Sequence, residues 1–194
     1  MGISRRLTAV LGAAAAIALP VASQAQVTYY TSGVFSSSGT NTVSNGGMTL
    51  SFAGLAPTTT GTPSNISFGD FISSGTGTGT FGGNFTLSVF QTAPSAGSGN
   101  FVGAITGSLT STSSLTYWNV TGPTAFSIGT TNYSLNTNAT PGGVGYSIVA
   151  PNNNAGHTTI QGFVSTTVPE PSSMALLGTG LIGLVPLVRI RRKA

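Results

Sequence analysis

Apolar residues alternate with Ser, Thr and Gly through the middle of the chain, from Gln26 to Thr167. The alternation is clearest in Met48–Phe52, Phe85–Val89 and Tyr146–Ile148, where every second residue is apolar. A period of two is typical of a strand with one buried face, because successive side chains point to opposite faces. Gly, Pro and Asn separate these segments as turn signals, so the pattern predicts many short strands joined by turns.

Short strands with frequent turns predict an all-β fold, and we expect residues 26–167 to form an antiparallel β-sandwich of jelly-roll or immunoglobulin-like type. Disorder is the alternative, since segments rich in Gly and Ser are often flexible. Aromatic residues at strand-like spacing favour a folded body, because each of them can bury a large area in a core. These residues are Phe52, Phe68, Phe71, Phe81, Phe85, Phe90, Phe101, Tyr117, Trp118, Phe126, Tyr133, Tyr146 and Phe163.

The basic residues lie only near the two ends of the sequence. Charged residues make up 4% of the chain, against about 25% in a typical globular protein. Every Lys and Arg precedes residue 7 or follows residue 188, so the positive charge behind the formal net charge of +4 lies at the ends. A nucleic-acid binder needs basic side chains on its folded surface to replace counterions at phosphates, so we exclude nucleic acid as a partner. The absence of Cys excludes disulfides and thiolate metal sites.

Residues 1–25 have the three parts of a signal peptide. A basic start is followed by apolar residues 7–19 and by small residues before a cleavage position after Ala25. The apolar run is shorter than the ~20 residues that a membrane span needs, which disfavours a retained anchor. We expect a signal helix here, export by the Sec route, and cleavage by signal peptidase between Ala25 and Gln26.

The sequence from Val168 onward combines a Pro-rich motif, an apolar segment and a basic cluster. The uncharged segment at about residues 172–188 has the minimum length for a transmembrane helix. By the positive-inside rule, the basic cluster in residues 189–194 would stay in the cytoplasm and leave the body outside. The motif consists of Val168, Pro169, Glu170 and Pro171, and the basic stop consists of Arg189, Arg191, Arg192 and Lys193.

This order of motif, helix and basic tail resembles the PEP-CTERM sorting signal, and the resemblance covers residues 168–194 alone. The resemblance implies that exosortase, a membrane-embedded transpeptidase-like enzyme, cuts near Pro169–Pro171 and releases or transfers the body. It also implies export through the inner membrane, a transient stay in that membrane, and delivery to the envelope, cell surface or extracellular matrix, with exopolysaccharide as a candidate partner. A plain tail anchor behind a Pro-rich linker is the alternative interpretation.

The body offers few groups for catalysis. Asp70 is its only carboxylate and His157 its only imidazole, which excludes a paired-carboxylate glycosidase and a Zn site of three or four protein ligands. A Ser-His-Asp triad would need a serine beside them, but the chain has no G-x-S-x-G elbow, and we expect His157 in an exposed loop. Gly77, Gly79 and Gly82 spell G-x-G-x-x-G, which we interpret as a hairpin. We predict no catalytic residue, no metal and no cofactor.

Sugar binding stays open, because Tyr29-Tyr30 or Tyr117-Trp118 could offer an aromatic face for stacking. In an alternating strand Tyr117 and Trp118 face opposite sides, which would leave one of the two exposed, and core packing is the alternative role. We expect a non-enzymatic structural or adhesive protein of the envelope or exopolysaccharide matrix. A carbohydrate-binding module is the alternative, and a hydrolase that depends on His157 is a third hypothesis. N-x-S/T triplets, which matter only if the host glycosylates them, occur at Asn65, Asn84, Asn119, Asn132 and Asn138.

Overall fold

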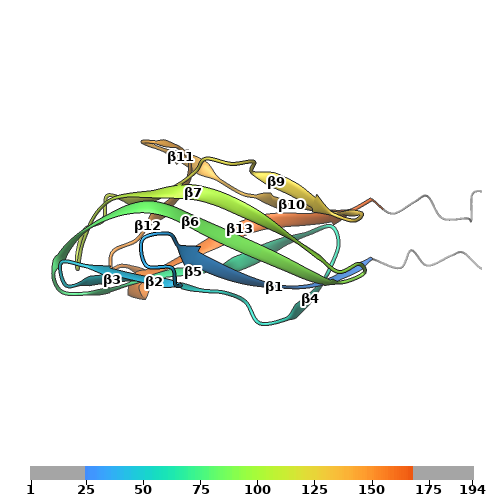
Figure 1. Ribbon diagram of the computed structural model, residues 1–194, viewed down its shortest axis with the longest axis horizontal. Coiled ribbons are helices and arrows are strands. Elements are labelled where there is room, and N and C mark those ends of the chain that lie inside the picture. The colour runs from blue at the N-terminus through green and yellow to red at the C-terminus, as the bar shows by residue number, and fades with distance from the viewer. Residues whose placement is uncertain (1–24, 168–194) are drawn as a thin grey trace, which may run out of the picture. The chain divides into compact units, whose positions relative to one another are not determined.

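The computed structural model describes residues 25–167, and their regular structure is almost entirely strand (Figure 1). The predicted signal helix and transmembrane helix lie outside these residues. A single 3-10 turn, η1 (Asn154–Gly156), is the helical element within residues 25–167. The strands are β1 (Gln26–Phe35), β2 (Thr42–Asn45), β3 (Met48–Ala53), β4 (Thr58–Gly61), β5 (Ser64–Gly75), β6 (Thr78–Ala93), β7 (Gly97–Thr110), β8 (Thr116–Val120), β9 (Ala125–Ile128), β10 (Thr131–Leu135), β11 (Asn138–Thr140), β12 (Gly143–Ile148) and β13 (His157–Thr166).

The strands form two antiparallel sheets that pack face to face (Figure 1). Sheet A has seven strands in the order β11-β12-β8-β7-β6-β1-β4, and sheet B has six in the order β2-β3-β5-β13-β10-β9. In Figure 1, β6 and β7 cross the front of the body, with β5 and β13 behind them. Hydrophobic side chains of both sheets form one buried cluster between the layers, so the predicted antiparallel sandwich is confirmed.

The long hairpin of β6 and β7 shows how the sequence sets the layers. The ladder between these strands begins with Thr78 opposite Thr110 and continues along almost the whole of β6. Within β6, the side chains of Phe85, Leu87 and Val89 are fully buried, while the residues between them are partly exposed. A slip of one residue would turn the apolar set toward solvent, so the alternation fixes the register of the pairing.

Aromatic side chains fill the centre of the sandwich. The ring centroid of Phe85 on β6 lies 4.7 Å from that of Phe71 on β5 and 5.4 Å from that of Trp118 on β8. The planes of Phe85 and Trp118 cross at 89°, the edge-to-face arrangement that adds about 0.5–1.5 kcal/mol per pair beyond the burial of area. The aromatic core that the sequence predicted is confirmed.

Some of the predicted core aromatics are less buried than expected. Phe163 is 37% exposed, and Phe90, Tyr117 and Phe126 are half-buried. Phe90, Tyr117 and Phe163 stand between buried neighbours in their strands, so the alternation turns these three side chains outward. Phe126 lies on β9, an edge strand of sheet B, where its ring packs against the core from the side.

Gly33 allows β1 to approach the aromatic core closely. A Cβ atom at this position would lie 2.4 Å from the ring of Phe85 and 2.5 Å from the ring of Phe52. Interiors are close-packed, so a methyl group cannot be added there unless both rings move. Glycine at this position therefore serves packing between β1 and its neighbours.

The Gly-rich segment around Gly77 joins β5 to β6. Because β5 ends at Gly75 and β6 begins at Thr78, the G-x-G-x-x-G residues lie in a tight turn and in the strand that follows. A Cβ atom on Gly77 would lie 1.9 Å from the carbonyl oxygen of Gly46, so this turn packs directly on the turn between β2 and β3. The predicted glycine hairpin was wrong, because β5 belongs to sheet B and β6 to sheet A, and the turn carries the chain from one sheet to the other.

Candidate functional site

Asp70 and His157, the charged residues that the sequence singled out, lie side by side on sheet B. Asp70 is on β5, His157 is the first residue of β13, and the distance from Nδ1 of His157 to Oδ2 of Asp70 is 3.7 Å. The expected loop position of His157 was wrong, because β13 pairs with β5 from its first residue. The two side chains are 44% and 35% exposed, so this ion pair lies at a solvated surface.

The Asp70–His157 pair stands apart from other groups with which it could form a reactive site. A Ser-His-Asp triad requires a serine hydroxyl within hydrogen-bond reach of the imidazole. Within residues 25–167, the polar contact of the His157 ring is with Asp70. The same residues contain no group of three or more His, Cys, Asp or Glu that could hold a metal ion. The geometry supports a surface ion pair.

Both candidate aromatic pairs split between the core and the outer face. Tyr29 is 2% exposed and donates a hydrogen bond of 3.0 Å to a backbone carbonyl oxygen of β5. Tyr30 points outward and stacks on Phe90, with 4.8 Å between ring centroids. Trp118 is fully buried and Tyr117 is half-buried. Neither pair therefore presents two adjacent rings to a ligand.

The buried tyrosines act as structural hydrogen-bond donors. The hydroxyl of Tyr133 donates to Oε1 of Gln91 at 2.8 Å, and the amide of Gln91 donates to the carbonyl oxygen of Ser95 at 2.8 Å. Burial raises the pKa of Tyr29 to about 12, and burial also raises the pKa of Tyr133. Both hydroxyls therefore stay protonated, and keep their acceptors, at any physiological pH.

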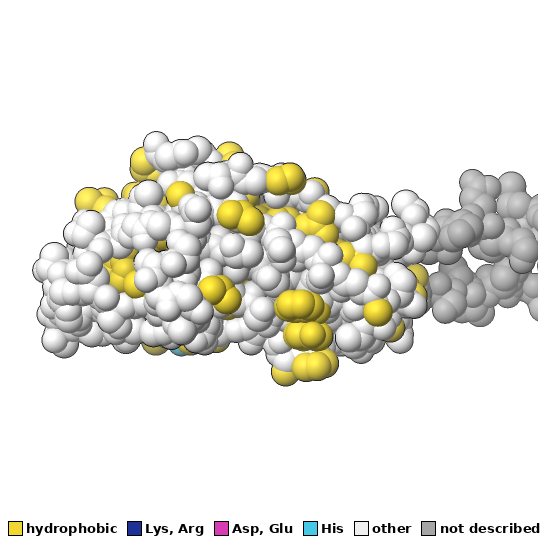
Figure 2. All heavy atoms as spheres, viewed as in Figure 1, with side chains coloured by type: hydrophobic (Ala, Val, Ile, Leu, Met, Phe, Trp, Pro, Cys, Tyr) yellow, Lys and Arg dark blue, Asp and Glu magenta, His cyan; other side chains and the backbone are white. Residues whose placement is uncertain are grey.

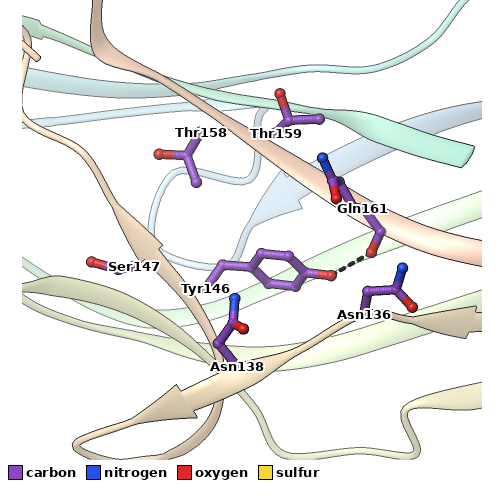
Figure 3. Close-up of a pocket in the computed structure, with 7 residues that line it drawn as sticks. All are labelled: Asn136, Asn138, Tyr146, Ser147, Thr158, Thr159 and Gln161. Atoms are coloured by element: carbon purple, nitrogen blue, oxygen red, sulfur yellow. Dashed lines mark hydrogen bonds between the residues drawn. The ribbon is translucent and has the colours of Figure 1, made fainter. Parts of the chain in front are cut away.

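A groove opens where β12 of sheet A lies beside β13 of sheet B (Figure 3). We call it the Gln161 groove; its volume is ≈ 320 Å³. The side chains come from β12, from β13 and from the segment that leaves sheet B after β10 and enters sheet A at β11. The lining residues are Asn136, Asn138, Tyr146, Ser147, Thr158, Thr159 and Gln161.

Two hydrogen bonds to one backbone oxygen hold the Gln161 groove together. The carbonyl oxygen of Gln161 accepts from the hydroxyl of Tyr146 at 2.5 Å and from the backbone N–H of Asn136 at 3.0 Å (Figure 3 shows the first). The first bond joins the two sheets, and the second joins β13 to the segment after β10. Tyr146 is 5% exposed, and burial raises the pKa of its hydroxyl, which keeps it a neutral donor. The fold thus fixes the walls of the groove.

A second hollow, with a volume of ≈ 270 Å³, adjoins the groove. It shares Asn136, Thr159 and Gln161 with the groove, and Asn65 and Ser67 of β5 extend the lining. Because β5 and β13 are hydrogen-bonded neighbours, the two hollows form one elongated polar surface across them.

The chemistry of this surface is neutral. Its polar side chains are amides and hydroxyls, which offer hydrogen-bond donors and acceptors without a charge. Phe163 lies two residues beyond Gln161 on the outward side of β13, opposite Asn65 in the register, and is 37% exposed. Such a lining suits a neutral ligand rich in hydroxyl groups, and the ring of Phe163 adds one aromatic surface near the end of the lining. No local sequence pattern marks this surface, because its residues come from separate segments.

One of the N-x-S/T asparagines is structural. Asn119 is 7% exposed; its Oδ1 accepts from the hydroxyl of Thr140 at 2.5 Å, and its amide donates to the hydroxyl of Thr106 at 3.3 Å. A buried, doubly bonded amide cannot carry a glycan in the folded body. The side chains at the other four triplets are exposed: Asn65, Asn84, Asn132 and Asn138.

The predicted sorting signal lies outside the described residues. Its motif residues Val168, Pro169, Glu170 and Pro171 and its basic residues Arg189, Arg191, Arg192 and Lys193 all follow Thr167. The predicted cleavage residues Ala25 and Gln26 are described, and Gln26 is the first residue of β1. In the stretch from Ala25 to Thr167, no helix has the length and apolar character that crossing a membrane requires.

Comparison with known proteins identifies the C-terminal segment. A family model of the PEP-CTERM protein-sorting motif matches residues 167–193. No curated protein and no solved structure matches the chain. The motif implies export across the inner membrane, processing by exosortase, and a surface or extracellular location. The chain is therefore a secreted protein whose PEP-CTERM sorting motif directs it to exosortase.

Proposed function

We propose that the sandwich body is a non-enzymatic structural or adhesive component of the cell envelope or exopolysaccharide matrix. The PEP-CTERM match at residues 167–193, directly after a folded body without Lys or Arg, is the observation that carries this proposal. Signal peptidase removes residues 1–25, and exosortase then cuts near Pro169–Pro171 and frees or transfers the body.

The surface of the body supports this role. Figure 2 shows a face made mostly of backbone and of side chains that are neither hydrophobic nor charged, with isolated hydrophobic side chains and one short row of them, and residues 25–167 contain no Lys or Arg. Hydroxyl and amide groups can exchange hydrogen bonds with the hydroxyls of a hydrated polysaccharide. Such contacts do not depend on attraction between net charges, so dissolved salt weakens them little.

A substitution of the sorting motif tests the route. With Pro169, Glu170 and Pro171 all changed to Ala, the chain should still be exported and inserted, because the apolar segment and the basic cluster remain. The uncut form should accumulate in the membrane, as seen by immunoblot of membrane and external fractions with a tag after Gln26.

A matched control changes Ser172 and Ser173 to Ala, which alters neighbouring residues and keeps the motif. This control should be processed like the wild type. If the triple-alanine chain is processed and released like the wild type, then the motif does not direct processing and the tail is only an anchor.

A second candidate function is carbohydrate binding at the Gln161 groove. It is favoured by the neutral amides and hydroxyls of the groove, whose backbone is held by the two bonds to the carbonyl oxygen of Gln161, and by the adjacent ring of Phe163. A change of both Asn136 and Gln161 to Ala removes two amides and leaves the backbone bonds of the floor in place. Each lost hydrogen bond should cost about 0.5–1.5 kcal/mol, so affinity should fall roughly tenfold.

The processed body would be tested on a glycan array and then by titration with the best neutral oligosaccharide. Asn100→Ala on β7 of sheet A, an exposed amide remote from the groove, is the control. No binding by the wild type, or equal loss in the control, would remove this candidate.

A further inference from the structure

Thr62, between β4 and β5, connects both ends of the described body. It is 4% exposed, and its backbone N–H donates to the carbonyl oxygen of Ala25 at 2.8 Å. Its hydroxyl donates to the same oxygen at 3.2 Å and lies 2.6 Å from the hydroxyl of Thr166. The start of β1 and the end of β13 are accordingly found at the same end of the sandwich (Figure 1).

The residue after Ala25 is also part of the fold. Gln26 pairs with Gly61 in the ladder of β1 and β4, and this ladder continues to Tyr29. Val27 is fully buried, so the first residues of β1 cannot be pulled away from the body without exposing an apolar side chain. The bond between Ala25 and Gln26 is thus held from both sides.

We propose that the folded body protects its own signal-peptide cleavage bond, so that signal peptidase must act before β1 closes onto β4. This inference rests on the proposed cleavage after Ala25. Folding and cleavage then compete for the same segment, and the order in which they occur decides whether the mature protein forms.

The chemistry of cleavage explains the protection. In hydrolysis, water adds its oxygen to the carbonyl carbon of Ala25, the C–N bond to Gln26 breaks, and the nitrogen leaves with a proton as a new amino group. An enzyme that catalyses this step places its own donors on the carbonyl oxygen as negative charge develops there. In the folded body Thr62 already donates to that oxygen twice. The segment must leave the ladder before it can enter an active site.

The expected effect follows from the population of the open form. Cleavage of a folded protein tracks the fraction of molecules in which the segment is locally open, when opening is fast. Because both hydrogen bonds and the burial of Val27 oppose opening, folded precursor should be cleaved at least about tenfold more slowly than newly exported chains.

A pulse-chase experiment on the full chain tests this order. Cells produce the precursor while a reversible inhibitor blocks signal peptidase, and the inhibitor is then washed out. The labelled chains that folded before washout are compared with chains made afterwards. Folding is scored by resistance of the body to thermolysin, since trypsin has no Lys or Arg to cut between residues 7 and 188.

A spacer variant is the matched control. Six Gly and Ser residues inserted between Gln26 and Val27 keep the cleavage residues and move them away from β4. We expect slow cleavage of folded wild-type precursor and equal, fast cleavage of old and new chains in the spacer variant. Equal rates for old and new wild-type chains would overturn the proposal, and so would slow cleavage of the folded spacer variant.

Sequencing of the mature N-terminus separates the two possible failures. A mature chain that begins elsewhere than at Gln26 refutes the proposed cleavage site. A chain that begins at Gln26, with equal rates for old and new precursor, refutes only the protection by the fold.

Discussion

The central test of the packing is the replacement of Phe85. This ring is fully buried and lies 4.7–5.4 Å, between centroids, from the rings of Phe71, Phe35, Phe52 and Trp118. Removal of a buried Phe side chain costs about 3–5 kcal/mol through lost burial and the cavity that remains. Such a loss is a large share of the about 5–15 kcal/mol by which a domain is stable.

A second substitution at the same position separates volume from aromatic contact. Phe85→Leu keeps most of the volume and loses the four ring contacts, so it should cost less, about 1–2 kcal/mol. Phe163→Ala is the control, because that ring is 37% exposed on the outer face of sheet B. Its removal should cost less than about 1 kcal/mol.

Denaturant unfolding of the processed body measures these differences. The chain has a single Trp, and Trp118 is buried against Phe85, so its fluorescence reports loss of the core directly. The denaturant concentration at the midpoint of unfolding should be lowered least by Phe163→Ala, more by Phe85→Leu and most by Phe85→Ala. If Phe85→Ala costs no more than Phe163→Ala, the proposed aromatic core does not hold the sheets together.

Three further predictions concern backbone approach, alkaline pH and charge. Gly33→Ala should destabilise the body by about 1–3 kcal/mol because its Cβ meets two rings, whereas Gly82→Ala, with no atom within 4 Å, should be nearly neutral in thermal melts. Burial raises the pKa of Tyr29 to about 12 from 10.0 in the unfolded chain. The contribution of the protonated Tyr29 hydroxyl to the free energy of unfolding is therefore complete below pH 10 and is lost as the pH rises through 12. Denaturation at pH 9 and pH 11 should show that Tyr29→Phe reduces this loss, and an equal loss in wild type and variant would contradict the assignment. Asp70→Asn should change the free energy of unfolding by less than about 0.5 kcal/mol, since its ion pair with His157 is well exposed; a larger loss in a denaturant titration would show that the pair is structural.

The strands were predictable because their signal is local. In β6 the period of two identifies Phe85, Leu87 and Val89 as one face, and in β8 it separates Trp118 from Tyr117. Where the alternation within a single strand decides which side chains are buried, the sequence is enough to predict them. The pattern does not say which face is inside when both carry large apolar residues, as β13 does with Phe163 on one face and Ile160 and Val164 on the other, and Phe163 was placed in the core for that reason.

His157 shows why a boundary was missed. Asn152–Asn154 is a strong turn signal, and the polar residues after it look like a continued loop. In the structure Asn154 and Ala155 adopt positive φ, Gly156 completes the turn, and β13 begins at once. Pairing with β5, which is distant in sequence, decides that His157 is in a strand.

The groove could not be predicted because no local pattern marks it. Ser67, Asn136 and Gln161 come from different strands and connections, and only the register of β5 with β13 and the crossing after β10 bring them together. Asn119 was read as a triplet asparagine for a related reason, since its burial depends on Thr106 and Thr140. Tertiary contacts, which one sequence does not display, decide both cases.

The position of β13 has a mechanical consequence for a protein held by its C-terminal end. β13 is an inner strand of sheet B, bonded to β5 on one side and to β10 on the other. Its last residue, Thr166, pairs with Thr131, and Val164 pairs with Ser64. A pull on the chain after Thr166 along the strand direction loads both ladders in shear, so that many hydrogen bonds share the force at once. An edge strand such as β9, with one neighbour, would instead peel away bond by bond, so a body anchored by its C-terminal end would be held through a strand that has hydrogen-bonded neighbours on both sides.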